Sequence, residues 1–141
     1  MAPCRQHLYP TGVAVEPGLV GSIELTVKDG DTAEALRSGD VPMLATPRLV
    51  ALSEEATVAA LDGHLDTKVT TVGQRVQLDH LLPVPVGRSV RCEAKLVEIE
   101  GRRLNFTFSV TCEQGLVAAG KVTRVIVNRE RFLERAKSTR D

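Results

Sequence analysis

The sequence predicts an α+β protein in which an antiparallel sheet wraps around one long central helix. Residues 45–61 repeat apolar side chains with the period of an amphipathic helix. Five other segments alternate apolar and polar residues in the manner of half-buried strands, namely 19–27, 67–82, 89–100, 103–112 and 116–127. Because a single long helix must cover one whole face of this sheet, the economical arrangement is a sheet curled around the helix.

The start of the helix is indicated by Thr46 and Pro47. A residue before proline is pushed into an extended conformation, and proline is favoured at the first helical position. Threonine is also a frequent N-cap. We therefore expect Thr46 to cap the helix, with its hydroxyl at the positive end of the helix dipole.

The two adjacent glutamates of this helix differ in their expected surroundings. Glu54 has Val50 and Val58 one turn before and after it, whereas Glu55 lies on the wetter side, near Arg48. The stripe that faces the core consists of small and apolar residues, Leu49, Ser53, Ala56 and Ala60. A carboxylate among apolar groups is costly unless it is paired, protonated or used. Glu54 therefore either marks the edge of the buried face or belongs to a site.

The strand predicted at 67–82 carries a histidine on its inward phase. By simple alternation, Val72, Val76 and Leu78 share a face with His80. His80 is either a core histidine bonded to backbone or a site residue. Gly73, in mid-strand, indicates a bulge or a close backbone approach.

The last strand places Arg124 on a phase that is otherwise apolar. Such an arginine needs an anion or a carbonyl beside it, unless it reaches water at the strand end. We expect a single domain over 1–141, with an irregular segment at 1–18 and a short helix at 128–139 capped by Asn128. A second short helix is expected at 31–38, capped by Asp31.

Composition excludes several classes of protein. The chain has 18 basic and 18 acidic residues and no tryptophan, which argues against a nucleic-acid surface. It has no apolar run long enough to span a bilayer and no apolar leader at its start, so a cytoplasmic location is expected. Its three cysteines include no CxxC pair, so neither a metal site nor a disulfide framework is expected, and we interpret Cys92 and Cys112 as core residues.

Four motifs, in order and with matching internal spacings, resemble the hot-dog fold thioesterases, most closely the fluoroacetyl-CoA thioesterase family. They are ATPxxxxxxxE ending at Glu54, GxxxxxxH from Gly73 to His80, the segment LLPVPVGRSVRCEAKLVEIEGRRLNFTFSV at 81–110, and GKVTR ending at Arg124. The resemblance covers about residues 19–135.

The resemblance implies a homodimer, with the possibility of a dimer of dimers, that hydrolyses an acyl-CoA thioester to a carboxylate and free coenzyme A. It implies that Thr46, Glu54 and His80 are catalytic and that Gly73 and Arg124 line the acyl pocket. It implies no cofactor apart from the coenzyme A of the substrate. Residues from both subunits would build each site. Eight helical residues separate Thr46 from Glu54 by roughly 12 Å, so the hydroxyl must fold back, act elsewhere on the substrate, or act across the dimer.

Two departures argue against fluoroacetyl specificity. The family enzyme shields its pocket with phenylalanines before the helix, whereas 31–44 here contains no aromatic residue. Pro47 also replaces a glycine. A different short or small acyl group is therefore expected. The alternative function is a non-catalytic hot-dog dimer that binds acyl-CoA or another small amphipathic molecule. A hydratase is a weaker reading, because Asp79 points away from the face of His80.

Overall fold

The computed structural model describes residues 14–138, which form five strands, three α-helices and one turn of 3-10 helix. In chain order the elements are β1 (Val20–Thr26), η1 (Asp29–Asp31), α1 (Ala33–Leu36), α2 (Thr46–Leu61), β2 (Val69–His80), β3 (Ser89–Glu100), β4 (Arg103–Cys112), β5 (Gly115–Asn128) and α3 (Arg129–Lys137). No helix among these residues is long and apolar enough to cross a membrane.

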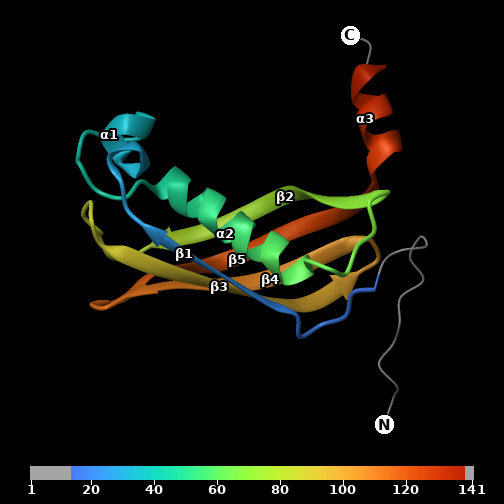
Figure 1. Ribbon diagram of the computed structural model, residues 1–141, viewed down its shortest axis with the longest axis horizontal. Helices are drawn as coiled ribbons and strands as arrows, with labels where there is room; N and C mark the ends of the chain where they lie inside the picture. The colour runs from blue at the N-terminus through green and yellow to red at the C-terminus, as the bar shows by residue number, and fades with distance from the viewer. Residues whose placement is uncertain (1–13, 139–141) are drawn as a thin grey trace.

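The strands form one antiparallel sheet in the order β1-β3-β4-β5-β2, which curls around α2 (Figure 1). The small residues of α2 allow β1 to approach closely: a Cβ at Gly21 would collide with the backbone of Ala56 and Ala60. The sheet leaves two edges, β1 and β2.

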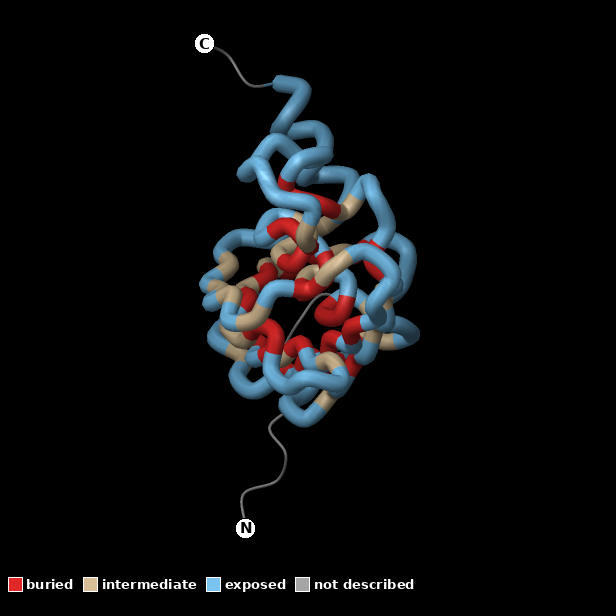
Figure 2. The backbone as a smooth tube through the Cα atoms, turned by 90° about the vertical axis from the view of Figure 1, so that its left-hand side faces the viewer, coloured by how far each residue is buried: buried red, intermediate tan, exposed pale blue. Residues whose placement is uncertain are grey.

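The core lies between α2 and the concave face of the sheet, and in Figure 2 the buried positions gather inside the ring of strands. Leu49, Ser53 and Ala56 have no exposed surface, as the helical periodicity predicted. Cys92 is likewise fully buried, whereas Cys112 is only partly buried against the core.

Of the three predicted caps, Asn128 is confirmed, because its side chain accepts from the Arg131 backbone at the start of α3, and the other two were placed one residue away from the observed ones. Ala45, not Thr46, is the extended residue before α2, and it provides no side-chain cap. Thr46 is the first helical residue and Pro47 the second, so the Thr46 hydroxyl is free for another partner. At α1 the capping side chain is Thr32, which accepts from the Ala35 backbone, rather than Asp31.

The bulge expected at Gly73 is confirmed, but it changes the predicted phase of β2. The register with β5 shifts between Gly73 and Arg75. Val72 therefore pairs with Val125, whereas Val76 pairs with the buried Val122 on the other face. Directly opposed residues share a face in antiparallel sheets. The expectation that Val72 shares the inward face of His80 was therefore wrong, and Thr71 takes that place.

Candidate active site

Thr46 and His80 form the first part of the candidate site. The Thr46 hydroxyl oxygen lies 2.8 Å from His80 Nδ1. The two residues come together because α2 begins where β2 ends. The other ring nitrogen, His80 Nε2, is the one buried side-chain nitrogen or oxygen in residues 14–138 without a hydrogen-bond partner. Buried polar atoms are nearly always bonded, so an orphan of this kind needs an explanation such as a catalytic role.

This pair opens onto a cleft of about 480 Å³. Its other walls come from the segment before α2 and the segment after β2, including Gly39, Val41, Met43, Leu44, Leu81, Leu82 and Pro83. None of these lining residues is a phenylalanine, tyrosine or tryptophan. The cleft is thus shaped by the 31–45 segment, whose position depends on how it is attached to α2.

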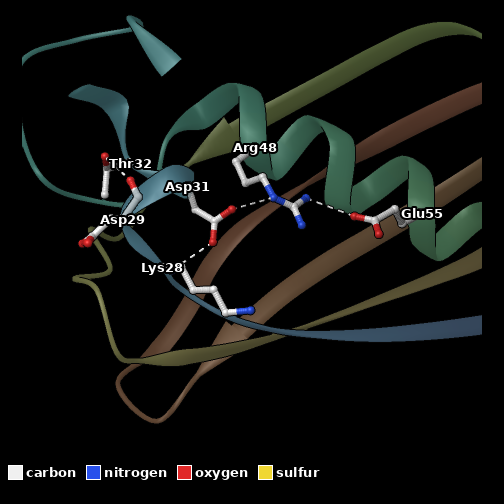
Figure 3. A network of polar contacts seen from close by, with 6 residues as sticks. All are labelled: Lys28, Asp29, Asp31, Thr32, Arg48 and Glu55. Atoms are coloured by element: carbon white, nitrogen blue, oxygen red, sulfur yellow. Dashed lines mark hydrogen bonds and ion pairs between the residues drawn. The ribbon is translucent and has the colours of Figure 1, made fainter. Parts of the chain in front are cut away.

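Arg48 attaches that segment to the helix (Figure 3). Its guanidinium lies 3.0 Å from carboxylate oxygens of both Asp31 and Glu55. The other Asp31 oxygen accepts from the Lys28 backbone at 2.9 Å. Partial burial lowers the pKa of Arg48, but its hydrogen bonds and charge contacts with Glu55 and Asp31 outweigh burial and raise the pKa above its usual value. Glu55 is therefore a structural partner of Arg48, as the helical wheel indicated.

Glu54, Gly73 and Arg124 form the second part of the candidate site. Arg124 Nη1 lies 3.4 Å from Glu54 Oε2. The rest of the guanidinium is held by Thr71, through its hydroxyl at 2.8 Å and its carbonyl at 3.1 Å. The expectation that Arg124 needs an anion or a carbonyl is confirmed, because it has both. Burial lowers the pKa of Arg124, while the charge and hydrogen bond of Glu54 oppose that shift.

Gly73 makes room for the Glu54 carboxylate. A Cβ at Gly73 would collide with Glu54 Oε2, and it would lie 3.6 Å from Arg124 Nη1. Glu54 is 36% exposed and sits at the edge of the buried face rather than inside it. With Arg124, Ile23 and Val58 it lines an open cleft of about 630 Å³.

Within one chain the structure brings Thr46 to His80, and Glu54 to Gly73 and Arg124, but it does not join the two groups. They line different clefts. Sequence reasoning missed Thr71, and it placed Arg48 beside Glu55 without linking it to Asp31. The sequence does carry a signal for Thr71: it is a polar residue two positions before Gly73, so it lies on the same face of β2 as Gly73. No group of three residues in the described part of the chain could hold a metal ion.

An antiparallel sheet curled around one long helix is the arrangement of the hot-dog fold, which this chain shares with solved members of the thioesterase superfamily. Residues 27–130 match the family described as fluoroacetyl-CoA-specific thioesterase, FlK. The chain belongs to this family.

Individual relatives agree with that assignment. The chain is 29% identical over 90 residues to the fluoroacetyl-CoA thioesterase of Streptantibioticus cattleyicolor, a match that spans 64% of this chain and 65% of that relative. A crystallised variant of FlK in complex with fluoroacetate and CoA is 25% identical, with a TM-score of 0.76 over 84% of this chain and 99% of that one. A Thermus thermophilus protein described as a thioesterase superfamily member is 26% identical, with a TM-score of 0.79 over 88% and 94% of the two chains.

Proposed function

We propose that the protein is a homodimeric acyl-CoA thioesterase in which each active site combines Glu54 and Arg124 of one subunit with Thr46 and His80 of the other. Family membership and the crystallised FlK variant with CoA support the substrate class. The observation that carries the composite site is the position of the two residue groups along β2, an edge strand with one free side.

One register of a symmetric β2 pair would bring the two residue groups together. Two antiparallel copies related by a two-fold axis at Gln77 would place Val76 opposite the partner subunit's Leu78. Counting the bulge as one position, Gly73 would then lie opposite the partner subunit's His80. Opposed residues share a face, so the imidazole would point to the side on which Glu54 covers Gly73. The Thr46–His80 cleft of one subunit would thus meet the Glu54–Arg124 cleft of the other across the interface.

The chemistry requires three contributions. Hydrolysis adds water across the C–S bond: oxygen joins the carbonyl carbon, the C–S bond breaks, and the thiolate takes a proton. Glu54, oriented by Arg124, attacks the carbonyl or activates the water. Thr46, at the positive end of α2, donates to the developing oxyanion. His80, whose two ring nitrogens can accept and donate protons, carries the proton to the departing thiolate.

The acyl group is short or small and need not be fluoroacetyl. The cleft beside His80 is bounded by small and aliphatic side chains, and its lining includes no aromatic ring to exclude water or to select a fluorinated group. The 31–44 segment contains only aliphatic and polar residues. Thiol release from a panel of acyl-CoAs would rank the acyl groups by kcat/KM.

Subunit complementation tests the composite site. Glu54→Gln and His80→Ala are expected to be inactive as homodimers. After mixing, unfolding and refolding, half of the dimers would be heterodimers, each with one intact site, so about a quarter of wild-type activity should return. If all three residues acted within one chain, the mixture would stay inactive. Equal rates for wild type and Glu54→Gln would remove Glu54 from the mechanism.

Binding without turnover would favour the alternative function. Calorimetry with the same acyl-CoA panel distinguishes the two outcomes, because a non-catalytic dimer would bind at least one acyl-CoA and release no thiol from any.

A further inference from the structure

We infer that helix α3 of each subunit docks on the partner and forms a wall of the partner's Thr46–His80 cleft. This inference rests on the proposed dimer. Helix α3 exposes apolar side chains to solvent. None of its nine residues is buried, and they include the large apolar residues Phe132, which is 40% exposed, and Leu133, which is 53% exposed. An isolated helix of this length is marginal in water, so its stability requires a surface to pack on.

The position of α3 indicates which surface that is. The helix leaves the sheet where β5 ends, and the Arg129 backbone donates to the Lys68 carbonyl just before β2. In Figures 1 and 2, which share a vertical axis, most of α3 extends away from the sheet, and Phe132 borders a cleft that Arg102 and Val127 of its own chain also line. In Figure 1 it rises beyond the β2 edge, at the end of the strand opposite α1. It therefore projects into the space that a β2-paired partner would fill.

The same register identifies the opposing segment. With the two-fold axis at Gln77, Val69 at the base of α3 falls opposite the partner's residues 83–85. The chain around those residues carries an unusual concentration of exposed apolar side chains: Leu81 is 57%, Val86 43% and Leu116 45% exposed. Leu81 adjoins β5 near Leu116, because its backbone donates to the Val117 carbonyl. Phe132 and Leu133 would cover this patch.

Docking there would complete the cleft. Leu81 follows His80 directly and lines the same cleft, so a helix packed on Leu81 lies at its mouth. The aromatic ring that the lining of one chain lacks would come from the partner's Phe132. Each acyl group would then be enclosed by the 31–45 segment of one subunit and by α3 of the other.

Cysteine cross-linking tests the contact independently of turnover. In a Cys4→Ser, Cys112→Ser background, the pair Leu81→Cys and Leu133→Cys should oxidise to a covalent dimer on non-reducing gels. Within one chain the two positions lie at opposite ends of β2, about 40 Å apart at ~3.3 Å per residue, so an intrachain bond is excluded. The control pair Leu81→Cys and Thr107→Cys, with Thr107 exposed on β4, should remain uncross-linked.

A substitution of Phe132 tests whether α3 forms a wall of the partner's Thr46–His80 cleft. Phe132→Ser should raise KM for acyl-CoA about tenfold, the scale of one lost apolar contact, while the dimer mass stays unchanged. Ala136→Ser, also exposed on α3, should leave KM unchanged. A dimer that hydrolyses acyl-CoA but neither cross-links nor responds to Phe132→Ser would overturn the docking and leave the proposed function intact. A monomer in solution would overturn both.

Discussion

Gly73→Ala should separate activity from stability. The new methyl group would collide with Glu54 Oε2, which belongs to a flexible side chain rather than to the backbone. The carboxylate must therefore move away from Gly73 by more than about 1 Å, a misplacement that can cost 10²-fold in rate. We expect kcat/KM to fall about 100-fold, equivalent to about 2.7 kcal/mol of transition-state stabilisation.

The stability of the same variant should change much less. Replacing glycine inside a strand recovers about 0.5–1 kcal/mol of backbone entropy. The ion pair lost in exchange involves a carboxylate that is 36% exposed, and solvent screening limits such pairs to about 1 kcal/mol or less. Arg124 also keeps both of its bonds to Thr71. The melting temperature should therefore shift by less than about 5 °C for a domain of this size.

Two other glycines provide controls, measured by thiol release and thermal unfolding. Gly30→Ala meets no atom within 4 Å and should match wild type in both assays. Gly120→Ala would collide with the Gln77 carbonyl, which is backbone and cannot swing aside, so this variant should fail to fold. Wild-type kcat/KM in a folded Gly73→Ala variant would refute the role assigned to the Glu54 position.

Three further predictions concern other groups. Thr46→Val removes the hydroxyl bonded to His80 and should lower kcat about 100-fold, whereas Thr46→Ser should retain most activity. Arg48→Met should raise KM and speed hydrogen exchange over 31–45, with Arg91→Met as the exposed control. Burial raises the pKa of Cys92 to about 12. Its thiol should resist Ellman's reagent at neutral pH, and its contribution to stability, complete below the unfolded pKa near 8.5, should be lost as pH rises towards 12.

For each of these three predictions, a specific result would contradict the reasoning. Full activity in Thr46→Val would make the contact with His80 structural only, and unchanged exchange in Arg48→Met would mean that other contacts hold the segment. For the thiol, the alkaline loss of stability should vanish in Cys92→Ala, and an equal loss in that variant would assign it to other groups.

Periodicity alone predicted most of the fold, since the buried stripe of α2 and the inward Arg124 follow from spacing. The N-cap of α2 was placed at Thr46 instead of Ala45, because a boundary shift of one residue is not visible in the periodicity. The structure shows that the Thr46 hydroxyl bonds to His80 and does not cap the helix. The pattern of residues did not predict that Glu54 and His80 of one chain line different clefts. Strand spacing says nothing about which side of an edge strand meets a second copy.

The bulge explains how one strand can serve both parts of the proposed site. Gly73 and His80 are seven residues apart, an odd number, so in a regular strand they would face opposite sides of the sheet. The register shift after Gly73 adds one residue and turns both positions towards α2. A symmetric β2 pair also requires opposed residues to share a face, and Gly73 and His80 do so because the bulge takes up one of the seven steps between them. Deleting Gln74 would remove that step and leave Gly73 and His80 six positions apart, so both would still face α2 in a regular strand. Hydrolysis should therefore persist where the sheet re-forms, and loss of thiol release in a folded deletion variant would refute this account of the strand.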